Sequence, residues 1–270
     1  APWEGAGRLR IRARVRQSRS LTRQTSRVPF VVAPFVLDLL GYVGAKPNTA
    51  DGASPQSVAI AGRILELLDV DHQASGGQPA GAALERGVAE LLADALPAAD
   101  NSRPWNVSRG GRISAYRQYA HLARLDALVK NEPTLRVELG LDYMISPDVT
   151  VSFEHGEGDL PPVLHAAVSC KFSIRSDRVQ NIRHEGVSMI RHRRGRQPHI
   201  VTVTSEPLPS RLAAICRGTG EVDAVYHVCL PALAHAVLEV GNSEQNNLLE
   251  EVIGQNRLFG LDELVEHLTV

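Results

Sequence analysis

The chain has 270 residues, of which 43% are hydrophobic, and this is enough for one large domain or two small ones. Its formal net charge of −1 gives no sign of a polyanionic partner. Three cysteines and the lack of a long apolar run exclude a disulfide-rich scaffold and a membrane-spanning protein. We therefore expect free thiols in a reducing compartment.

Charge is unevenly distributed along the chain. Residues 171–217 contain ten Lys or Arg and three acidic residues, whereas residues 221–270 contain one Arg and nine acidic residues. Local fields steer ligands better than the total charge does. The pattern indicates a basic middle segment, followed by an acidic tail that we interpret as a solvated helical face.

The N-terminal residues are basic. Residues 8–16 alternate Arg with apolar residues, which predicts a strand with one Arg face. Such a strand could be an arm that contacts phosphates, or the segment could be a disordered or non-native extension. We therefore treat residues 1–45 as an uncertain basic extension and residues 46–270 as a single domain.

Three helices are predicted in the first half of this domain. After a loop at residues 44–56, Ser57 is expected to cap the first helix, and the second follows a Gly-rich turn at residues 75–77. Glu85 lies beside the apolar stripe of the second helix. The third helix is expected at residues 114–130.

The second half alternates short strands with helices. Strands are predicted at residues 148–153, 163–171, 199–204 and 224–229, with helices at residues 177–193 and 209–217 and a helical acidic tail. This order predicts an α/β fold, in which a mixed sheet is flanked by helices.

Residues at two strand ends suit phosphodiester hydrolysis. Ser169 and Lys171 point to the same face of one predicted strand, and Asp148 shares that face if its strand pairs with it. A carboxylate can hold a hard cation such as Mg²⁺, and a lysine can position the attacking water or stabilise charge on the phosphate. Pro-Asp and Ser-x-Lys also occur by chance, and Lys171 could be an ordinary surface lysine.

One acidic residue of the usual nuclease pattern is missing. That pattern is Pro-Asp, a spacer and then Asp/Glu-x-Lys, and here Ser169 replaces the second acid. Glu185 lies fourteen residues after Lys171, on the helix predicted to follow the strand. We therefore expect its carboxylate to reach the same site.

The sequence around Lys171 resembles the CCGG family of type II restriction endonucleases, within the PD-(D/E)xK nuclease superfamily. Residues 169–178 read Ser-Cys-Lys-Phe-Ser-Ile-Arg-Ser-Asp-Arg, and a displaced glutamate is a trait of this family. The likeness is greatest to a member that cuts GCCGGC. It runs from about Asn48 to about Ala236 and includes Ala50-Asp51-Gly52, Gly77-Gln78 with Glu85, Trp105-Asn106-Val107 and residues 164–231.

This resemblance implies roles for individual residues. Five match the catalytic group, namely Asp148, Lys171, Glu185, Ser169 and Glu85. Three match the ligands of Mg²⁺, namely Asp148, Glu185 and the main-chain carbonyl of Cys170. Six match the residues that contact bases, namely Arg175, Asp177 and Arg178 in the CCGG core, Gln78 in the minor groove, and Asp51 and Arg211 at the outer base pair.

The chemistry of these residue types suits a G·C-rich site, because Arg pairs with guanine and a carboxylate accepts from the amino group of cytosine. Other roles remain open. Asp177 could cap its helix, Asp51 could belong to an ordinary Asp-Gly turn, and Arg211 could contact only a phosphate.

The resemblance implies a restriction-endonuclease core that cleaves double-stranded DNA with Mg²⁺, most simply as G/CCGGC with 5′-phosphate ends and four-nucleotide 5′ overhangs. A palindromic site requires at least a dimer, and the resemblance implies a homotetramer that binds two sites. The resemblance also implies an enzyme of the prokaryotic cytoplasm, with a cognate methyltransferase that protects the host DNA. The alternatives are a non-specific or repair nuclease with the same core, and a catalytically silent DNA-binding protein.

Overall fold

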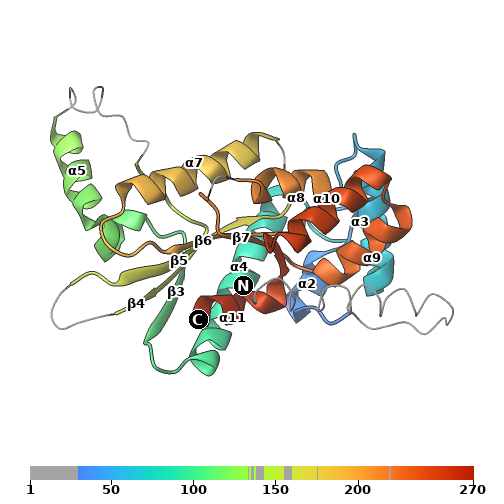
Figure 1. Ribbon diagram of the computed structural model, residues 1–270, viewed down its shortest axis with the longest axis horizontal. Coiled ribbons are helices and arrows are strands. Elements are labelled where there is room, and N and C mark those ends of the chain that lie inside the picture. The colour runs from blue at the N-terminus through green and yellow to red at the C-terminus, as the bar shows by residue number, and fades with distance from the viewer. Residues whose placement is uncertain are drawn as a thin grey trace, which may run out of the picture.

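The computed structural model describes residues 30–132, 134, 137, 143–154, 160–174, 176–218 and 220–270, and of residues 176–178 it describes only the main chain. A central sheet with helices on both sides dominates the arrangement (Figure 1). The Arg-rich strand predicted at residues 8–16 lies outside the described residues.

The sheet has six strands in the order β3-β4-β5-β6-β7-β8. β3 pairs with β4 and β4 with β5 in antiparallel fashion, while the remaining neighbours are parallel. The mixed sheet confirms the predicted α/β class. The strand bounds are Trp105–Arg109, Val149–Phe153, Val163–Lys171, His199–Thr204, Ala224–His227 and Leu258–Gly260.

The two faces of β5 are covered by different helices, because successive side chains point to opposite sides of a strand. Val168 and Cys170 join a core that includes Leu84 and Leu92 of helix α4 (Gly77–Ala99). On the other face, Ala167 joins a second core cluster together with Met189 of helix α7 (Ser176–His192). Figure 1 shows α4 and α7 on opposite sides of the sheet. This arrangement leaves the end of β5, with Lys171, at the rim between the two layers.

Further helices extend the main core at the right-hand end of Figure 1, where α3 packs against α9 and α10 against α8. The bounds are α2 (Pro34–Leu39), α3 (Pro55–Leu68), α8 (Pro209–Cys216), α9 (Leu230–Val240), α10 (Ser243–Gly254) and α11 (Leu264–Thr269), with the hairpin β1 (Tyr42–Val43) and β2 (Lys46–Pro47). Val36 and Leu39 of α2, which precede residue 46, are buried in the main core. All three cysteines are free, as predicted, and the structure shows that all three are buried. None of the described helices combines the length and apolarity needed to cross a bilayer.

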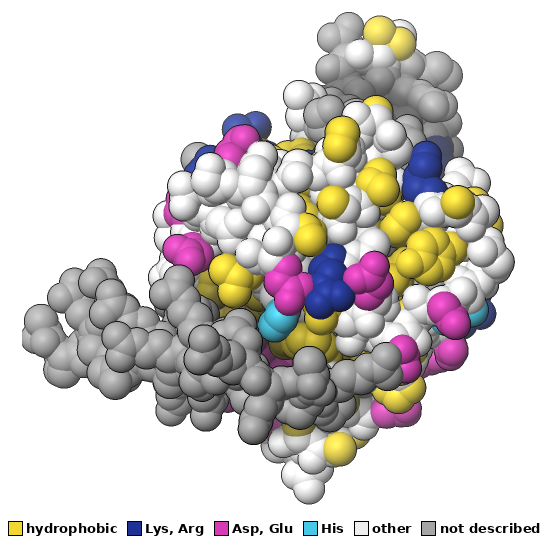
Figure 2. All heavy atoms as spheres, turned by 90° about the vertical axis from the view of Figure 1, so that its right-hand side faces the viewer, with side chains coloured by type: hydrophobic (Ala, Val, Ile, Leu, Met, Phe, Trp, Pro, Cys, Tyr) yellow, Lys and Arg dark blue, Asp and Glu magenta, His cyan; other side chains and the backbone are white. Residues whose placement is uncertain are grey.

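Charges of both signs lie together on the side of the molecule formed by α3 and α9. Arg63 of α3 pairs with Glu66 at 2.8 Å and with Glu239 of α9. Figure 2 faces this side and shows acidic side chains flanking a basic one, among apolar and uncharged groups. The mixed sign of the charge contrasts with the basic segment at residues 171–217.

The helix predicted at residues 114–130 is shorter than expected. Two single turns, η1 (Ile113–Ala115) and η2 (Arg117–Tyr119), precede helix α5 (Ala120–Asn131). The side chain of Gln118 accepts from the N–H of Leu164 and donates to its carbonyl, at 3.0 and 2.7 Å. This tertiary contact with β5 fixes the chain at Gln118, so α5 begins only at Ala120.

Strands β3 and β8 were not predicted. In β3, only Trp105 and Val107 are apolar, and among the described strands β3 lies at an edge of the sheet and pairs only with β4. β8 has three residues and lies at the opposite edge. Edge strands as short as these carry too little alternation to be recognised from local pattern.

Close packing around Gly186 fixes the position of α7. A Cβ atom at this residue would lie 2.3 Å from the main-chain oxygen of Glu221. Gly186→Ala should therefore lower the free energy of unfolding by about 1–3 kcal/mol, because overpacking forces the backbone to shift. Urea denaturation followed by circular dichroism measures this change.

Gly81→Ala in α4 is the matched control, since an added Cβ there meets no atom within 4 Å. It should leave stability unchanged or raise it by about 0.5–1 kcal/mol, because Ala restricts the unfolded chain more than Gly does. Equal effects of the two substitutions would show that α7 is not closely packed at Gly186.

Candidate active site

The carboxylate of Asp148 and the ammonium group of Lys171 meet at one end of β4 and β5. Asp148 immediately precedes β4, Lys171 ends β5, and the antiparallel register pairs Val149 with Val168. Lys171 Nζ lies 2.6 Å from Asp148 Oδ2, and the two side chains are 19% and 23% exposed. The two side chains are thus largely covered by their neighbours and remain accessible to an approaching ligand.

Two main-chain groups hold Asp148 in place. The N–H of Cys170 donates to Asp148 Oδ2 at 2.7 Å, and the N–H of Gly110, which follows β3, donates to the main-chain oxygen of Asp148 at 3.0 Å. The residue is therefore anchored to both neighbouring strands. The contacts of the Asp148 carboxylate with Cys170 and Lys171 both use Oδ2. No described residue forms a hydrogen bond with Oδ1, so this oxygen is available to a ligand.

Glu185 of α7 and Ser169 of β5 line a pocket next to this pair, together with Pro147. Burial raises the pKa of the Glu185 carboxyl, and the charge of Asp148 raises it further, whereas Lys171 and a hydrogen bond with Ser169 lower it. The structure thus brings the displaced glutamate to the serine that replaces the expected acid, within the electrostatic influence of Asp148 and Lys171.

Thr202 belongs to the same pocket and was not singled out from the sequence. It lies opposite Ser169 in the parallel register of β5 and β6. Its Oγ1 is buried and has no hydrogen-bond partner among the described residues. A buried hydroxyl group normally finds a partner in protein, water or ligand, so the pocket suits an oxygen-rich ligand. The alternation along β6 is the signal that could have identified it.

Glu85 lies on the α4 side of the sheet. Its carboxylate pairs with Arg109 of β3 at 3.3 Å. Burial raises the pKa of the Cys170 thiol well above its usual value, the negative charge of Asp148 raises it further, and Glu85 also contributes. Glu85 therefore lies near Cys170 and the site, but on the opposite side from the Glu185 pocket.

Asp51 and Arg211 are joined by an ion pair across 160 positions of sequence. Arg211 lies in α8, and its side chain is 26% exposed. Asp51 Oδ1 also accepts from the N–H of Ala53 at 3.0 Å, as in an Asp turn. The Asp51 N–H donates to Ser57 Oγ at 2.9 Å, while Ser54, and not Ser57 as predicted, caps α3. The turn and the ion pair thus coexist.

The other base-contacting candidates are only partly described. Gln78 is exposed in the first turn of α4. Arg175 lies outside the described residues, and Asp177 and Arg178 belong to α7, with their side chains outside the description.

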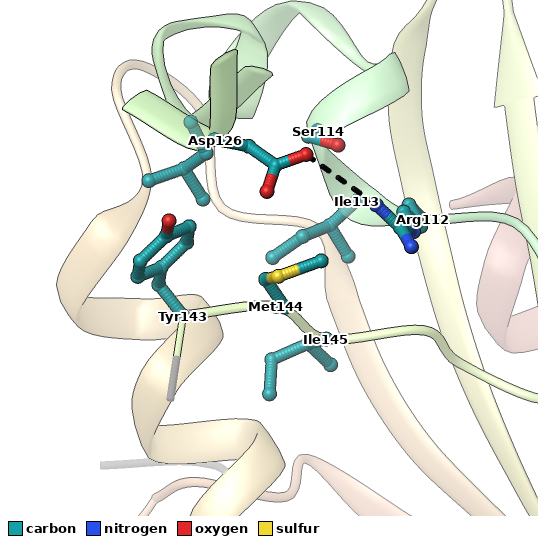
Figure 3. A pocket seen from close by; sticks show the side chains of 8 residues that line it. Arg112, Ile113, Ser114, Asp126, Tyr143, Met144 and Ile145 are labelled. Carbon is teal, nitrogen blue, oxygen red and sulfur yellow. Dashed lines mark ion pairs between the residues drawn. The ribbon is translucent and has the colours of Figure 1, made fainter. Parts of the chain in front are cut away.

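A second pocket lies beneath the segment that leads to Asp148. Figure 3 shows Tyr143, Met144 and Ile145 facing Ile113 and the ion pair of Arg112 with Asp126. Arg112 and Asp126 are 3.6 Å apart, and the N–H of Ile113 donates to the carbonyl of Ile145 at 3.1 Å. None of the candidate catalytic residues lines this pocket. We therefore interpret the contacts of its lining residues as structural, because they hold the chain that precedes β4.

Comparison with known proteins shows the family. A family model described as the NgoMIV restriction enzyme matches residues 37–159 and 152–270. The type II restriction enzyme NgoMIV of Neisseria gonorrhoeae is 36% identical over an alignment 257 residues long, which covers 83% of this chain and 90% of that relative. The chain therefore belongs to the NgoMIV restriction enzyme family and is a type II restriction endonuclease, a site-specific deoxyribonuclease.

Proposed function

We propose that this endonuclease cleaves both DNA strands at GCCGGC after the first G, in a Mg²⁺-dependent reaction that leaves 5′-phosphate ends and four-nucleotide 5′ overhangs. The observation that carries the proposal is the 2.6 Å contact of Lys171 with Asp148, at the end of two paired strands and beside the pocket of Glu185 and Ser169. The GCCGGC assignment comes from the sequence resemblance, which covers most of the chain.

Lys171 is the residue best placed to act on the phosphate. Its ammonium group is held by Asp148 at an open strand end, where it can position a water molecule or stabilise negative charge on the phosphate oxygens. The water attacks phosphorus in line and the 3′ oxygen leaves. We assign Ser169 the role of orienting Glu185, because the two side chains line the same pocket. Glu85, held by Arg109, would shape the site from the α4 side.

The donor groups fit Mg²⁺. The candidate ligands are the carboxylates of Asp148 and Glu185 and the main-chain carbonyl of Cys170, all of them oxygens. Mg²⁺ is commonly held by one or two carboxylates and several waters. Among the described residues no three His, Cys, Asp or Glu side chains form a metal-binding group. When bound, the ion would lower the pKa of a water molecule and neutralise charge on the phosphate.

Base reading is assigned to two sets of residues. Arg175, Asp177 and Arg178 would read the CCGG core in the major groove, and Gln78 would contact the minor groove. Asp51 and Arg211 would read the outer G·C pair, because a carboxylate can accept from cytosine while a guanidinium group donates to guanine. The Asp51–Arg211 ion pair supports this assignment, since both groups must reach the same base pair.

A palindromic site implies that two subunits act together, one on each strand. We propose a homotetramer of two such dimers, each bound to one site. The enzyme would act in the cytoplasm of a prokaryote beside a methyltransferase that protects the same sequence.

Digestion of a DNA library tests the proposed site. The library contains the duplexes NCCGGN with all outer base pairs, and the product ends are sequenced after digestion with Mg²⁺. We expect GCCGGC to be cut with at least about tenfold preference over the other palindromes, because a wrong base pair costs about 1–3 kcal/mol. The ends should carry 5′-phosphate and a four-nucleotide overhang.

The alternatives give different products. Preferential cutting of ACCGGT or TCCGGA would reject the outer pair and retain the core. Equal cutting of unrelated sequences would indicate a non-specific nuclease, and binding without cleavage would indicate a silent DNA-binding protein.

A further inference from the structure

Glu206 is a fully buried carboxylate at the end of β6, outside the catalytic pair. Its side chain has no exposed surface. Oε2 accepts from the N–H of Ile174 at 2.7 Å, and Oε1 accepts from the N–H of Leu208 at 3.1 Å. An isolated carboxylate is costly to bury, so these contacts and a nearby positive charge must compensate it.

That positive charge belongs to Arg211. Its Nη1 lies 3.7 Å from Glu206 Oε2, while Nη2 pairs with Asp51. A guanidinium group carries five donors in a rigid fork, so two acidic partners on different edges restrict its orientation. Glu206 thus holds, from inside the protein, the same side chain that Asp51 holds at the surface.

The other partner of Glu206 belongs to the chain that follows β5. Ile174 directly precedes Arg175, the first residue assigned to the CCGG core. Ser205 adds a second link, because its Oγ donates to the carbonyl of Phe172 at 2.5 Å. Two hydrogen bonds therefore connect the segments after β5 and β6, and in the first of them the acceptor is the carboxylate that faces Arg211.

We propose that Glu206 is a positioning residue for sequence recognition. It holds Arg211 at the outer base pair, in a fixed position relative to the segment after β5 that reads the core. The proposal rests on the proposed function, because that function assigns Arg211 and Arg175 to base contacts. The proposal adds a residue that contacts no base itself and that connects the two sets of base-contacting residues.

The charge state of Glu206 allows a direct test. Burial raises its pKa to about 7, while the hydrogen bond from Ile174 and the charge of Arg211 lower it. The charged neighbours are Arg211 and, beyond it, Asp51. Nε2 of His227 contacts the main-chain oxygen of Glu206 at 3.2 Å, and burial lowers the pKa of this imidazole to about 4, so it stays neutral above pH 6.

Below pH 7 the protonated carboxyl loses its attraction for Arg211, so discrimination at the outer base pair should weaken. Loss of folding does not explain such a change. The pKa of Glu206 is higher in the folded than in the unfolded chain, so the folded state binds the proton more tightly. Titration of Glu206 therefore makes the fold more stable, and not less, as the pH falls through 7.

The experiment compares kcat/KM for the preferred NCCGGN palindrome with that for the other three, between pH 6 and 8.5. The ratio cancels pH effects on the chemical step that all substrates share. For the wild type we expect the ratio to fall at least about tenfold between pH 8.5 and 6, the equivalent of about 1.4 kcal/mol. Glu206→Gln should show the low ratio at every pH.

Asp223→Asn is the matched control. Asp223 Oδ2 accepts from the N–H of Ile200 at 2.8 Å, so this carboxylate also binds the main chain of β6, but at the opposite end of the strand. This variant should keep the wild-type ratio and its pH dependence.

A folded Glu206→Gln variant with the wild-type ratio at pH 8.5 would overturn the proposal, as would a wild-type ratio that does not change with pH. If the variant does not fold, the wild-type pH series decides by itself. The identity of the preferred outer pair tests the proposed function separately. A pH-dependent preference for an outer A·T pair would retain the role of Glu206 and reject GCCGGC, whereas no outer preference at all would contradict both.

Discussion

Lys171→Ala should abolish DNA cleavage, with a loss in kcat of about 10²–10³-fold or more, as when a group that stabilises transition-state charge is removed. The fold should survive, because Lys171 ends β5 at the rim of the sheet and Asp148 keeps its hydrogen bond from the N–H of Cys170. Single-turnover cleavage of a duplex that contains the site measures the loss. Binding of the same duplex with Ca²⁺ in place of Mg²⁺ should be close to that of the wild type.

Lys130→Ala provides the control for this experiment. Lys130 is in α5, is 68% exposed and pairs with Asp126 at 3.1 Å. The substitution therefore removes a lysine and an ion pair outside the proposed site. It should cleave at the wild-type rate. A purified Lys171→Ala variant that cleaves as fast as this control would show that the active site lies elsewhere.

Glu185→Gln should slow cleavage by at least about 10²-fold, because the acid absent at position 169 has to come from α7. Glutamine has nearly the same shape as glutamate, so the loss would report the charge of the carboxylate. The double variant Ser169→Glu with Glu185→Ser returns the acid to β5. It should recover part of the activity, since the two residues line the same pocket.

Glu90→Gln, at an exposed position of α4, is the control for loss of one acidic charge and should leave the rate unchanged. Full activity in Glu185→Gln would mean that another residue supplies the second carboxylate. Glu85→Gln would then be measured first, because Glu85 lies near Cys170 on the α4 side.

Local pattern alone predicted the central part of the sheet. The strands at residues 163–171 and 199–204 have the bounds that the sequence indicated, and α7 begins and ends within one residue of its prediction. These elements carry long apolar or alternating runs, so their periodicity is strong. The same alternation places Ser169 and Lys171 on one face of β5.

The sequence by itself determined the class of fold, the family and the composition of the candidate site. The partners of the site residues were decided only by tertiary structure. Lys171 meets Asp148 because β4 and β5 pair in one register, and Asp51 meets Arg211 across 160 positions. Glu206 gained its importance from burial, which no local pattern reports. The reason is physical: periodicity encodes which face of an element is apolar, whereas contacts between distant residues depend on how whole elements pack.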